Sequence, residues 1–302
     1  MYYYHYKEKD MKIIMNKSEI NSNKNIDLSA ANSQKKFILA TDFDGTLCCE
    51  GVIKQSVIKA IEDFRNRGNL FGIVTGRDFT GIRDVLKIFS ELSVDFIISN
   101  NGAQAFDENE NILFSNKADG SIRYGEYTLA ELFIIKCLQL TSQPCGIAFE
   151  KTKFDFHPDF ENGGELDNIK YSPFSALKDV KEFVSGNAIC KNPEEAASVV
   201  ASLKNEFGKY LNPVQNARCI DITPAGVDKA YGIKQLADLM NIPYDNIWVS
   251  GDNYNDMPMV EKFHGCAVEN AVDELKDIAE YVCEDVGDVI HKILSSDTSE
   301  CM

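Results

Sequence analysis

The sequence predicts an α/β fold: a parallel sheet with helices on both faces, interrupted by an inserted α+β unit. Three observations predict this fold. Short apolar runs alternate with amphipathic helical patterns near both ends of the chain, while the middle mixes short strands with helices. The length of 302 residues also accommodates two domains at roughly 150 residues each.

The first part of the chain has the pattern of βαβ units. Its apolar runs are short and continuous, which is typical of strands buried on both faces, and the intervening segments have apolar residues at helical spacing. Gly68 follows the first helical segment as a stop signal. The expected order is strand 36–44, helix 57–64, strand 70–76, helix 82–89 and strand 94–100.

In the middle of the chain the regular alternation of strands and helices stops. Residues 104–116 read as an antiparallel hairpin that turns at the polar segment 108–111. The other elements expected there are helix 129–140, strand 146–150, strand 186–191 and helix 196–207. The alternation of buried strands and amphipathic helices then returns, with strand 219–222, helix 233–240, strands 246–252 and 266–269, and helix 290–294. We therefore expect a discontinuous Rossmann-like core of residues 36–103 and 219–302, an inserted α/β cap of residues 104–218, and a polar, disordered leader of residues 1–35.

Composition limits the classes of function. Hydrophobic residues make up 44% and charged residues 26%, as in an ordinary soluble globular protein. The formal net charge of −16 has the wrong sign for binding nucleic acid or an anionic membrane surface. The nine cysteines contain no C-x-x-C pair, and the first 35 residues contain no secretory or membrane-spanning apolar run. These observations predict a cytoplasmic protein with reduced thiols.

Four polar clusters follow expected buried strands. They are residues 42–46 (DFDGT), 75–77 (TGR), 100–102 (NNG) and 251–256 (GDNYND). In open α/β sheets ligands bind outside the carboxyl ends of the strands, so we expect the clusters to converge on one crevice. Each cluster alone could be an ordinary turn or helix cap.

The carboxylates in these clusters indicate a metal site. Asp42 and Asp44 are two residues apart at a strand end, and Asp252 and Asp256 would join them. At about 5 Å and an effective dielectric constant of about 20, each like-charged pair costs about 3 kcal/mol, so the cluster needs a cation. The expected ligand atoms are all oxygens, which favours Mg²⁺; the calcium-loop spacing is not matched.

Phosphate binding is predicted at the same place. Thr75 and the backbone of Gly76 can donate hydrogen bonds to phosphate oxygens at a helix start. Lys229, at the start of a helix, is the one cation that we place in the site. Its alternative role is that of an exposed lysine in a first helical turn.

In this order, the motifs resemble those of the haloacid dehalogenase superfamily. The segments that carry the resemblance are 42–46, 75–77, Lys229 and 251–256. Residues 99–103, together with the long insert, are similar to the Cof-type sugar-phosphatase branch, whose type II cap is inserted at that point. The resemblance covers residues 36 to about 294.

The resemblance implies a Mg²⁺-dependent phosphatase acting on a small phosphorylated metabolite, with a sugar phosphate as the expected class. Asp42 would attack phosphorus and form an aspartyl-phosphate, while Asp44 would act as general acid and then as base. Mg²⁺ would be held by the carboxylates of Asp42 and Asp252 and by the main-chain oxygen of Asp44. The phosphoryl group would be held by Thr75, Gly76, Lys229 and Asn255, with Asp256, Arg77 and Asn101 in support.

Two other functions stay open at this point. Phosphomannomutases resemble this branch, so an intramolecular phosphotransferase is one alternative, and a non-catalytic phosphate-binding regulator is another. The insert would act as a lid that reads the leaving group. Its polar residues Lys151, Lys153, His157 and Tyr171 are more simply ordinary loop residues. The expected partner is a small phosphate ester, with no nucleic acid, membrane or obligate protein partner indicated.

Overall fold

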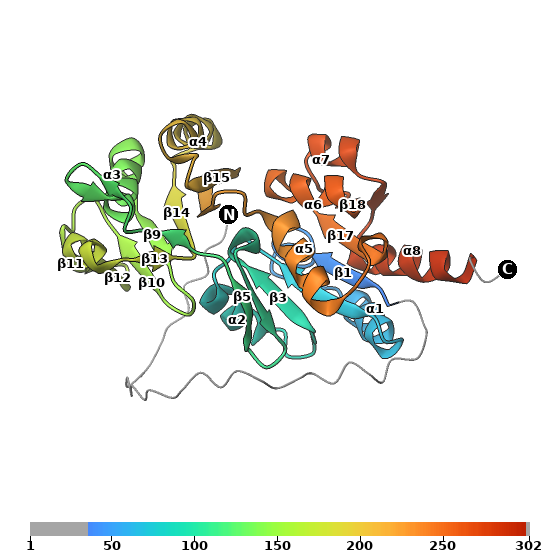
Figure 1. Ribbon diagram of the computed structural model, residues 1–302. Helices are drawn as coiled ribbons and strands as arrows, with labels where there is room; N and C mark the ends of the chain where they lie inside the picture. Colours follow the sequence, from blue (N-terminus) through green and yellow to red (C-terminus); the bar gives the residue numbers. More distant parts are fainter. Residues whose placement is uncertain (1–35, 300–302) are drawn as a thin grey trace. The chain divides into compact units, whose positions relative to one another are not determined.

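The computed structural model describes residues 36–299, so the expected leader of residues 1–35 lies outside the described part. The larger sheet has eight strands (Figure 1). In spatial order they are β19 (Tyr281–Cys283), β18 (His264–Val268), β17 (Ile247–Gly251), β1 (Ile38–Thr41), β2 (Leu70–Val74), β3 (Phe96–Ser99), β4 (Gln104–Asp107) and β5 (Ile112–Ser115). All neighbours pair in parallel except β3 with β4 and β4 with β5.

Helices cover both faces of this sheet (Figure 1). One face packs against α1 (Gln55–Asn66), α2 (Phe79–Leu86) and α8 (Val286–Ser299), and the other against α5 (Lys229–Met240), α6 (Met257–Lys262) and α7 (Asp273–Ile278). Strand residues alternate between the two cores: Leu39 belongs to the first, and Ile38 and Ala40 belong to the second. The predicted core architecture is therefore confirmed.

The second sheet has five strands and is entirely antiparallel. Its order is β10 (Lys153–Phe156), β9 (Cys145–Ala148), β14 (Ser185–Ile189), β16 (Cys219–Pro224) and β15 (Leu211–Asn216). Helices α3 (Leu129–Thr141) and α4 (Pro193–Phe207) pack against one face, where Phe133 and Leu203 meet Ile147 and Ile222. Thr128 begins α3 with a capping box to Glu131. We refer to this sheet and its helices as the cap.

The remaining elements are short. The strands are β6 (Ala118–Asp119), β7 (Arg123–Tyr124), β8 (Tyr127–Thr128), β11 (Asn162–Leu166), β12 (Ile169–Pro173) and β13 (Glu182–Phe183). The 3-10 helices are η1 (Asn100–Gly102), η2 (Phe174–Asp179), η3 (Tyr244–Asn246) and η4 (Tyr254–Asp256). Of these, η1 and η4 lie at the ends of core strands and carry residues of the site.

Three strands, β4, β5 and β16, belong to a different sheet than the sequence suggests. The hairpin 104–116 forms as predicted, but β4 and β5 extend the large sheet instead of starting the cap. Residues 219–222 were expected in the core, whereas β16 pairs antiparallel with β14 and β15. A short apolar run has the same pattern in either sheet, and the tight turn at Ala217, where φ is +50°, joins β16 to β15. The chain therefore leaves the large sheet after β5 and leaves the cap sheet after β16, and not at the expected boundaries 103/104 and 218/219.

Two further features concern cysteines and membrane crossing. The eight cysteines among the described residues form no disulfide. In the same part of the chain, every helix is too short or too polar to cross a membrane.

Candidate active site

Asp42 lies at the carboxyl end of β1, which is flanked by β2 on one side and β17 on the other. From β1 the sheet continues to β2 and β3 on one side and to β17 and β18 on the other. Open α/β sheets bind ligands at such a point, where the strand order reverses. The Asp42 amide donates to the main-chain oxygen of Ser250 at 2.8 Å, which ties the end of β1 to β17. The residue is 6% exposed. Its carboxylate is therefore held by two strands at the edge where the predicted crevice lies.

Lys229 connects Asp42 to Asp256. It is the first residue of α5, whose N-cap Asp228 accepts a hydrogen bond from the Tyr231 amide. Lys229 is fully buried, and its Nζ lies 2.7 Å from Asp42 Oδ1 and 2.6 Å from Asp256 Oδ1. Burial lowers the pKa of Lys229, but attraction by the two carboxylates outweighs burial and raises the pKa above its usual value. The alternative of an exposed lysine is therefore wrong.

The loop after β17 orients Asp256. Its Oδ2 accepts hydrogen bonds from the amides of Asp252 at 2.9 Å and Asn253 at 3.0 Å. A side chain at Gly251 would collide with the Asp256 carboxylate, which explains the glycine at that position. Asp252 accepts a hydrogen bond from Thr46 Oγ1 at 2.8 Å. The loop after β1, which carries Thr46, and the loop after β17 therefore both contribute to one acidic site.

The carboxylates of Asp42, Asp252 and Asp256 offer oxygen atoms within 4.8 Å of one another. With one ammonium group from Lys229, the four groups carry a formal charge of −2. Burial raises the pKa of Asp42 well above its usual value; Lys229 opposes this shift, while Asp256 and Asp252 add to it. Burial and the charge of Asp256 raise the pKa of Asp252 to about 6. An all-oxygen donor set with excess negative charge fits a hard divalent cation.

Asp44 does not join this group of carboxylates. Its side chain pairs with Arg77, with Nε donating to Oδ2 at 2.6 Å and Nη2 to Oδ1 at 2.7 Å. The Asp44 side chain is 53% exposed, in contrast to that of Asp42. Ligation of a metal by the main-chain oxygen of Asp44 stays a prediction.

The phosphate-binding candidates lie on adjoining loops. Thr75 is buried, and its Oγ1 accepts the Arg77 amide at 3.2 Å. Asn255 Nδ2 donates to Asn101 Oδ1 at 3.2 Å, which joins η4 to η1. The structure thus brings the predicted residues of four separate segments together.

Sequence reasoning missed Asp221. This residue of β16 accepts hydrogen bonds from Asn101 Nδ2 at 2.9 Å and from Asn216 Nδ2 at 3.4 Å. A Cβ atom at Gly76 would lie 2.8 Å from Asp221 Oδ2, so the cap carboxylate lies against the predicted phosphate-binding turn. Burial raises the pKa of Asp221, although Asn101, Asn216 and Lys229 lower it. The only signal in the sequence was an acidic residue inside the apolar run 219–222.

A family model for haloacid dehalogenase-like hydrolases matches residues 39–292, which include all four motifs. The chain belongs to this family. Its relatives include a protein from Buchnera aphidicola subsp. Schizaphis graminum, which is 25% identical over 255 residues, 79% of this chain and 86% of the relative. The 5-amino-6-(5-phospho-D-ribitylamino)uracil phosphatase YitU of Bacillus subtilis is 23% identical over 259 residues, 81% of this chain and 91% of the relative.

The fold of this hydrolase also occurs in solved structures. The subclass IIB sugar phosphatase BT4131 superposes with a TM-score of 0.67 at 20% identity, covering 86% of this chain and 98% of the other. At this level of identity the similarity supports the fold, which is a haloacid dehalogenase core with an inserted cap.

The cap residues singled out from the sequence are mostly structural in the hydrolase. The rings of His157 and Tyr171 are in contact at a tilted angle of 59°, with 5.0 Å between their centroids, and Tyr171 is buried. Lys151 Nζ donates to the Glu110 main-chain oxygen at 3.2 Å. The Lys153 side chain is 53% exposed, and its Nζ lies 3.2 Å from Asp155 Oδ2. Lys153 lies two residues before Asp155 in β10, so it shares the sheet face that carries Asp155 and Asp221.

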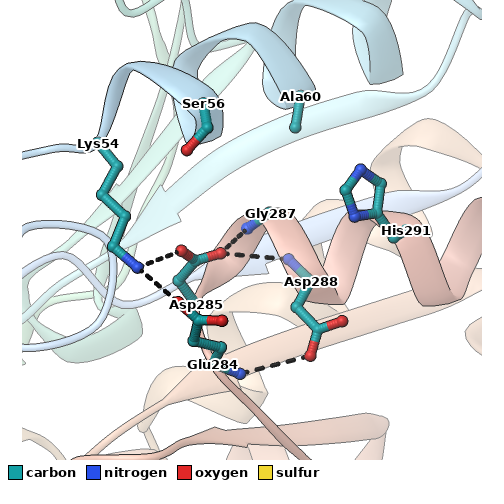
Figure 2. A pocket seen from close by; sticks show the side chains of 8 residues that line it. All are labelled: Lys54, Ser56, Ala60, Glu284, Asp285, Gly287, Asp288 and His291. Carbon is teal, nitrogen blue, oxygen red and sulfur yellow. Dashed lines mark hydrogen bonds and ion pairs between the residues drawn. The ribbon is translucent and has the colours of Figure 1, made fainter.

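Two other features lie outside the chemistry of the site. Burial and Asp44 raise the pKa of Cys48 to about 11, so this thiol next to the acidic loop is not activated. A pocket of about 470 Å³ lies between α1 and the start of α8. Lys54 pairs there with Glu284 and Asp285 (Figure 2). None of the motif residues lines this pocket.

Proposed function

We propose that this hydrolase is a Mg²⁺-dependent phosphatase that cleaves phosphate monoesters of small metabolites, with sugar phosphates as the expected class. The observation that carries the proposal is the placement of Lys229 between Asp42 and Asp256 beside Asp252. The relatives add support, because one acts on a phosphorylated ribityl compound and another is a sugar phosphatase by name.

In this proposal an oxygen of Asp42 attacks phosphorus in line with the leaving oxygen. A phosphorus–oxygen bond to Asp42 forms while the bond to the leaving group breaks, and Asp44 donates a proton to the leaving alkoxide. Asp44, now a carboxylate, then takes a proton from water, which attacks the aspartyl-phosphate and releases inorganic phosphate. Asp42 is restored as a carboxylate.

The other residues bind the phosphoryl group and organise the acidic site. Lys229, Thr75, the backbone of Gly76 and Asn255 hold phosphoryl oxygens, and Asn101 orients Asn255. Mg²⁺, held by Asp42 and Asp252 and by the main-chain oxygen of Asp44, would neutralise charge on the transferred group. Asp256 keeps Lys229 in place through their ion pair.

Phosphate release by the purified protein tests the proposal. We expect turnover of p-nitrophenyl phosphate and of a panel of sugar phosphates with Mg²⁺, and loss of turnover in Asp42→Asn. Asp159→Asn is the matched control, because this carboxylate is 82% exposed on a cap loop. Inactivity of the wild type, or full activity of Asp42→Asn, would refute the proposal.

The same assay separates hydrolysis from the alternatives. A phosphomutase would return an isomeric phosphate ester instead of free phosphate. A non-catalytic regulator would bind phosphate in a Mg²⁺-coupled titration without any turnover. Acid quenching during turnover, followed by hydroxylamine treatment, should reveal an acyl phosphate on Asp42.

A further inference from the structure

Three consecutive residues after β3 adopt left-handed backbone conformations. The φ angles are +52° at Asn100, +48° at Asn101 and +96° at Gly102, and we refer to these residues as the asparagine turn. Glycine adopts such angles freely, whereas a residue with a side chain is strained there. A glycine at position 100 would avoid this strain, so the Asn100 side chain indicates a role beyond shaping the turn.

The asparagine turn is hydrogen-bonded to the proposed phosphate-binding groups. The Asn100 amide donates to the main-chain oxygen of Arg77, and the Asn101 amide donates to that of Thr75, both at 2.9 Å. Asn101 Oδ1 also accepts a hydrogen bond from Asn255 Nδ2 at 3.2 Å. A shift of the asparagine turn would therefore displace Thr75 and Asn255 together.

The cap holds the Asn100 side chain. Ser185 Oγ, at the start of β14, donates to Asn100 Oδ1 at 2.6 Å. On the other side of the amide, Asn100 Nδ2 donates to Ser99 Oγ at 3.2 Å. Asn100 and Ser185 are both buried. The orientation of the Asn100 amide therefore depends on a hydroxyl that the cap supplies.

An apolar cluster adjoins this hydrogen bond. Val184, the residue before Ser185, packs with Ala103, the residue after the asparagine turn, and with Val227. All three residues of the cluster are buried. Because close packing fixes the spacing of the two segments, Ser185 and Asn100 meet in a fixed geometry that is shielded from water.

Loss of the Ser185 hydroxyl would leave the Asn100 oxygen buried without this donor, which is costly enough to displace the asparagine turn. We propose that Ser185 is a positioning residue, which acts through Asn100 and the asparagine turn on the groups that hold the phosphoryl group. Ser185 acts on the phosphate and not on the leaving group, so its effect is the same for every phosphate ester. This inference rests on the proposed phosphatase function.

Calorimetric titration of inorganic phosphate in the presence of Mg²⁺ tests the positioning role, because phosphate binding needs no turnover. Ser185→Ala should raise the Kd for phosphate at least about fivefold, the loss of an ordinary hydrogen bond, with an unchanged stoichiometry because the site is still folded. Asn100→Gly keeps the backbone amides and suits the left-handed angle, and should raise the Kd by at least the same factor. The double variant should bind no more weakly than Asn100→Gly alone, because both changes remove the same contact.

Thr141→Val separates phosphate affinity from stability. Thr141 Oγ1 donates to the Cys137 main-chain oxygen at 2.9 Å at the end of α3, so this variant also removes a buried hydroxyl from the cap. Urea unfolding should show a loss of stability in both Thr141→Val and Ser185→Ala, whereas only Ser185→Ala should raise the Kd for phosphate. In Ser185→Ala, kcat/KM should fall by a common factor for p-nitrophenyl phosphate and for each sugar phosphate that the wild type cleaves.

An unchanged Kd in Ser185→Ala or Asn100→Gly, or an equal rise in Thr141→Val, would overturn the positioning role. So would additive losses in the double variant, a loss in kcat/KM confined to some of the esters, or a wild type that does not bind phosphate. Phosphate binding by the wild type without turnover would refute only the phosphatase, and the Kd values of the variants would still decide the role of Ser185.

Discussion

Arg77 holds Asp44 by both carboxylate oxygens, at 2.6 and 2.7 Å, in a bidentate pair. The guanidinium carbon also lies 6.0 Å from the centre of the Phe43 ring, which places Arg77 over the loop between the two aspartates. Because the pair fixes the plane of the Asp44 carboxylate, Arg77 controls where the proposed acid and base points. In the proposed mechanism this pair would have to open before Asp44 could take up a proton and present it to the leaving group.

Replacing Arg77 by lysine should therefore impair turnover while keeping the charge. A lysine cannot reproduce the bidentate geometry, and we expect kcat to fall at least about tenfold, part of what general acid–base catalysis contributes. The control is Arg67→Lys at the exposed end of α1, which should behave as the wild type. Steady-state kinetics with p-nitrophenyl phosphate measures the effect; equal activities of the two variants would contradict it.

Replacing Lys229 should destabilise the fold as well as abolish activity. Lys229→Met leaves Asp42 and Asp256 buried without their cation, and breaking such a buried pair costs about 3–5 kcal/mol. Urea unfolding in EDTA measures the loss. Lys234→Met, on the same helix, removes an exposed pair with Asp238 and a surface contact with the Tyr244 ring, and serves as the control. A stability of Lys229→Met equal to that of the control would show that the buried ion pairs are unimportant.

The stability of the metal-free protein should depend on Asp252 in a defined pH range. The folded-state pKa is about 6 and the usual value is 3.8, so the folded state retains a proton that the unfolded state loses between these values. The contribution of Asp252 to stability therefore falls as the pH rises from about 4 to about 6, and stays constant above that range. We expect the difference in Tm between Asp252→Asn and the wild type, in EDTA, to grow in favour of the variant over this interval.

Added Mg²⁺ should reverse this trend in the wild type, because a cation favours ionised carboxylates and stabilises the state that binds it. The increase in Tm on adding Mg²⁺ should be small at pH 5 and full at pH 7. A difference between variant and wild type that is independent of pH would contradict the raised pKa.

Gly102 should tolerate no side chain. Its φ is +96°, and an added Cβ would overlap the main-chain oxygen of Asp228, the residue before Lys229. We expect Gly102→Ala to cost about 3 kcal/mol or more, combining left-handed strain with overpacking. Gly226→Ala is the matched control: its φ is +77°, but nothing lies within 4 Å, so only about 1 kcal/mol of strain is expected. Urea unfolding compares the two, and equal losses would rule out the contact with Asp228.

The alternation of apolar runs and helical periodicity was sufficient to predict the core. The segments before Asp42, Thr75 and Asp252 are continuous apolar runs, which are typical of strands buried between two layers of helices, and β1, β2 and β17 form there. The family also followed from the motif residues, because their types and order are local properties of the chain.

Local pattern could not decide which sheet each short strand joins. The run 219–222 is apolar in either environment, and only pairing with β14 and β15 places β16 in the cap. That pairing carries Asp221 to Asn101, which is 120 residues away in the sequence. The pairing of Arg77 with Asp44 likewise depends on side-chain orientation after the two loops have met. The sequence by itself determined the core fold, the family and the acidic motifs, because these depend on residue type and spacing. Only the tertiary structure decided which cap side chains lie beside the phosphate-binding turn, because strand pairing and register join residues that no local pattern connects.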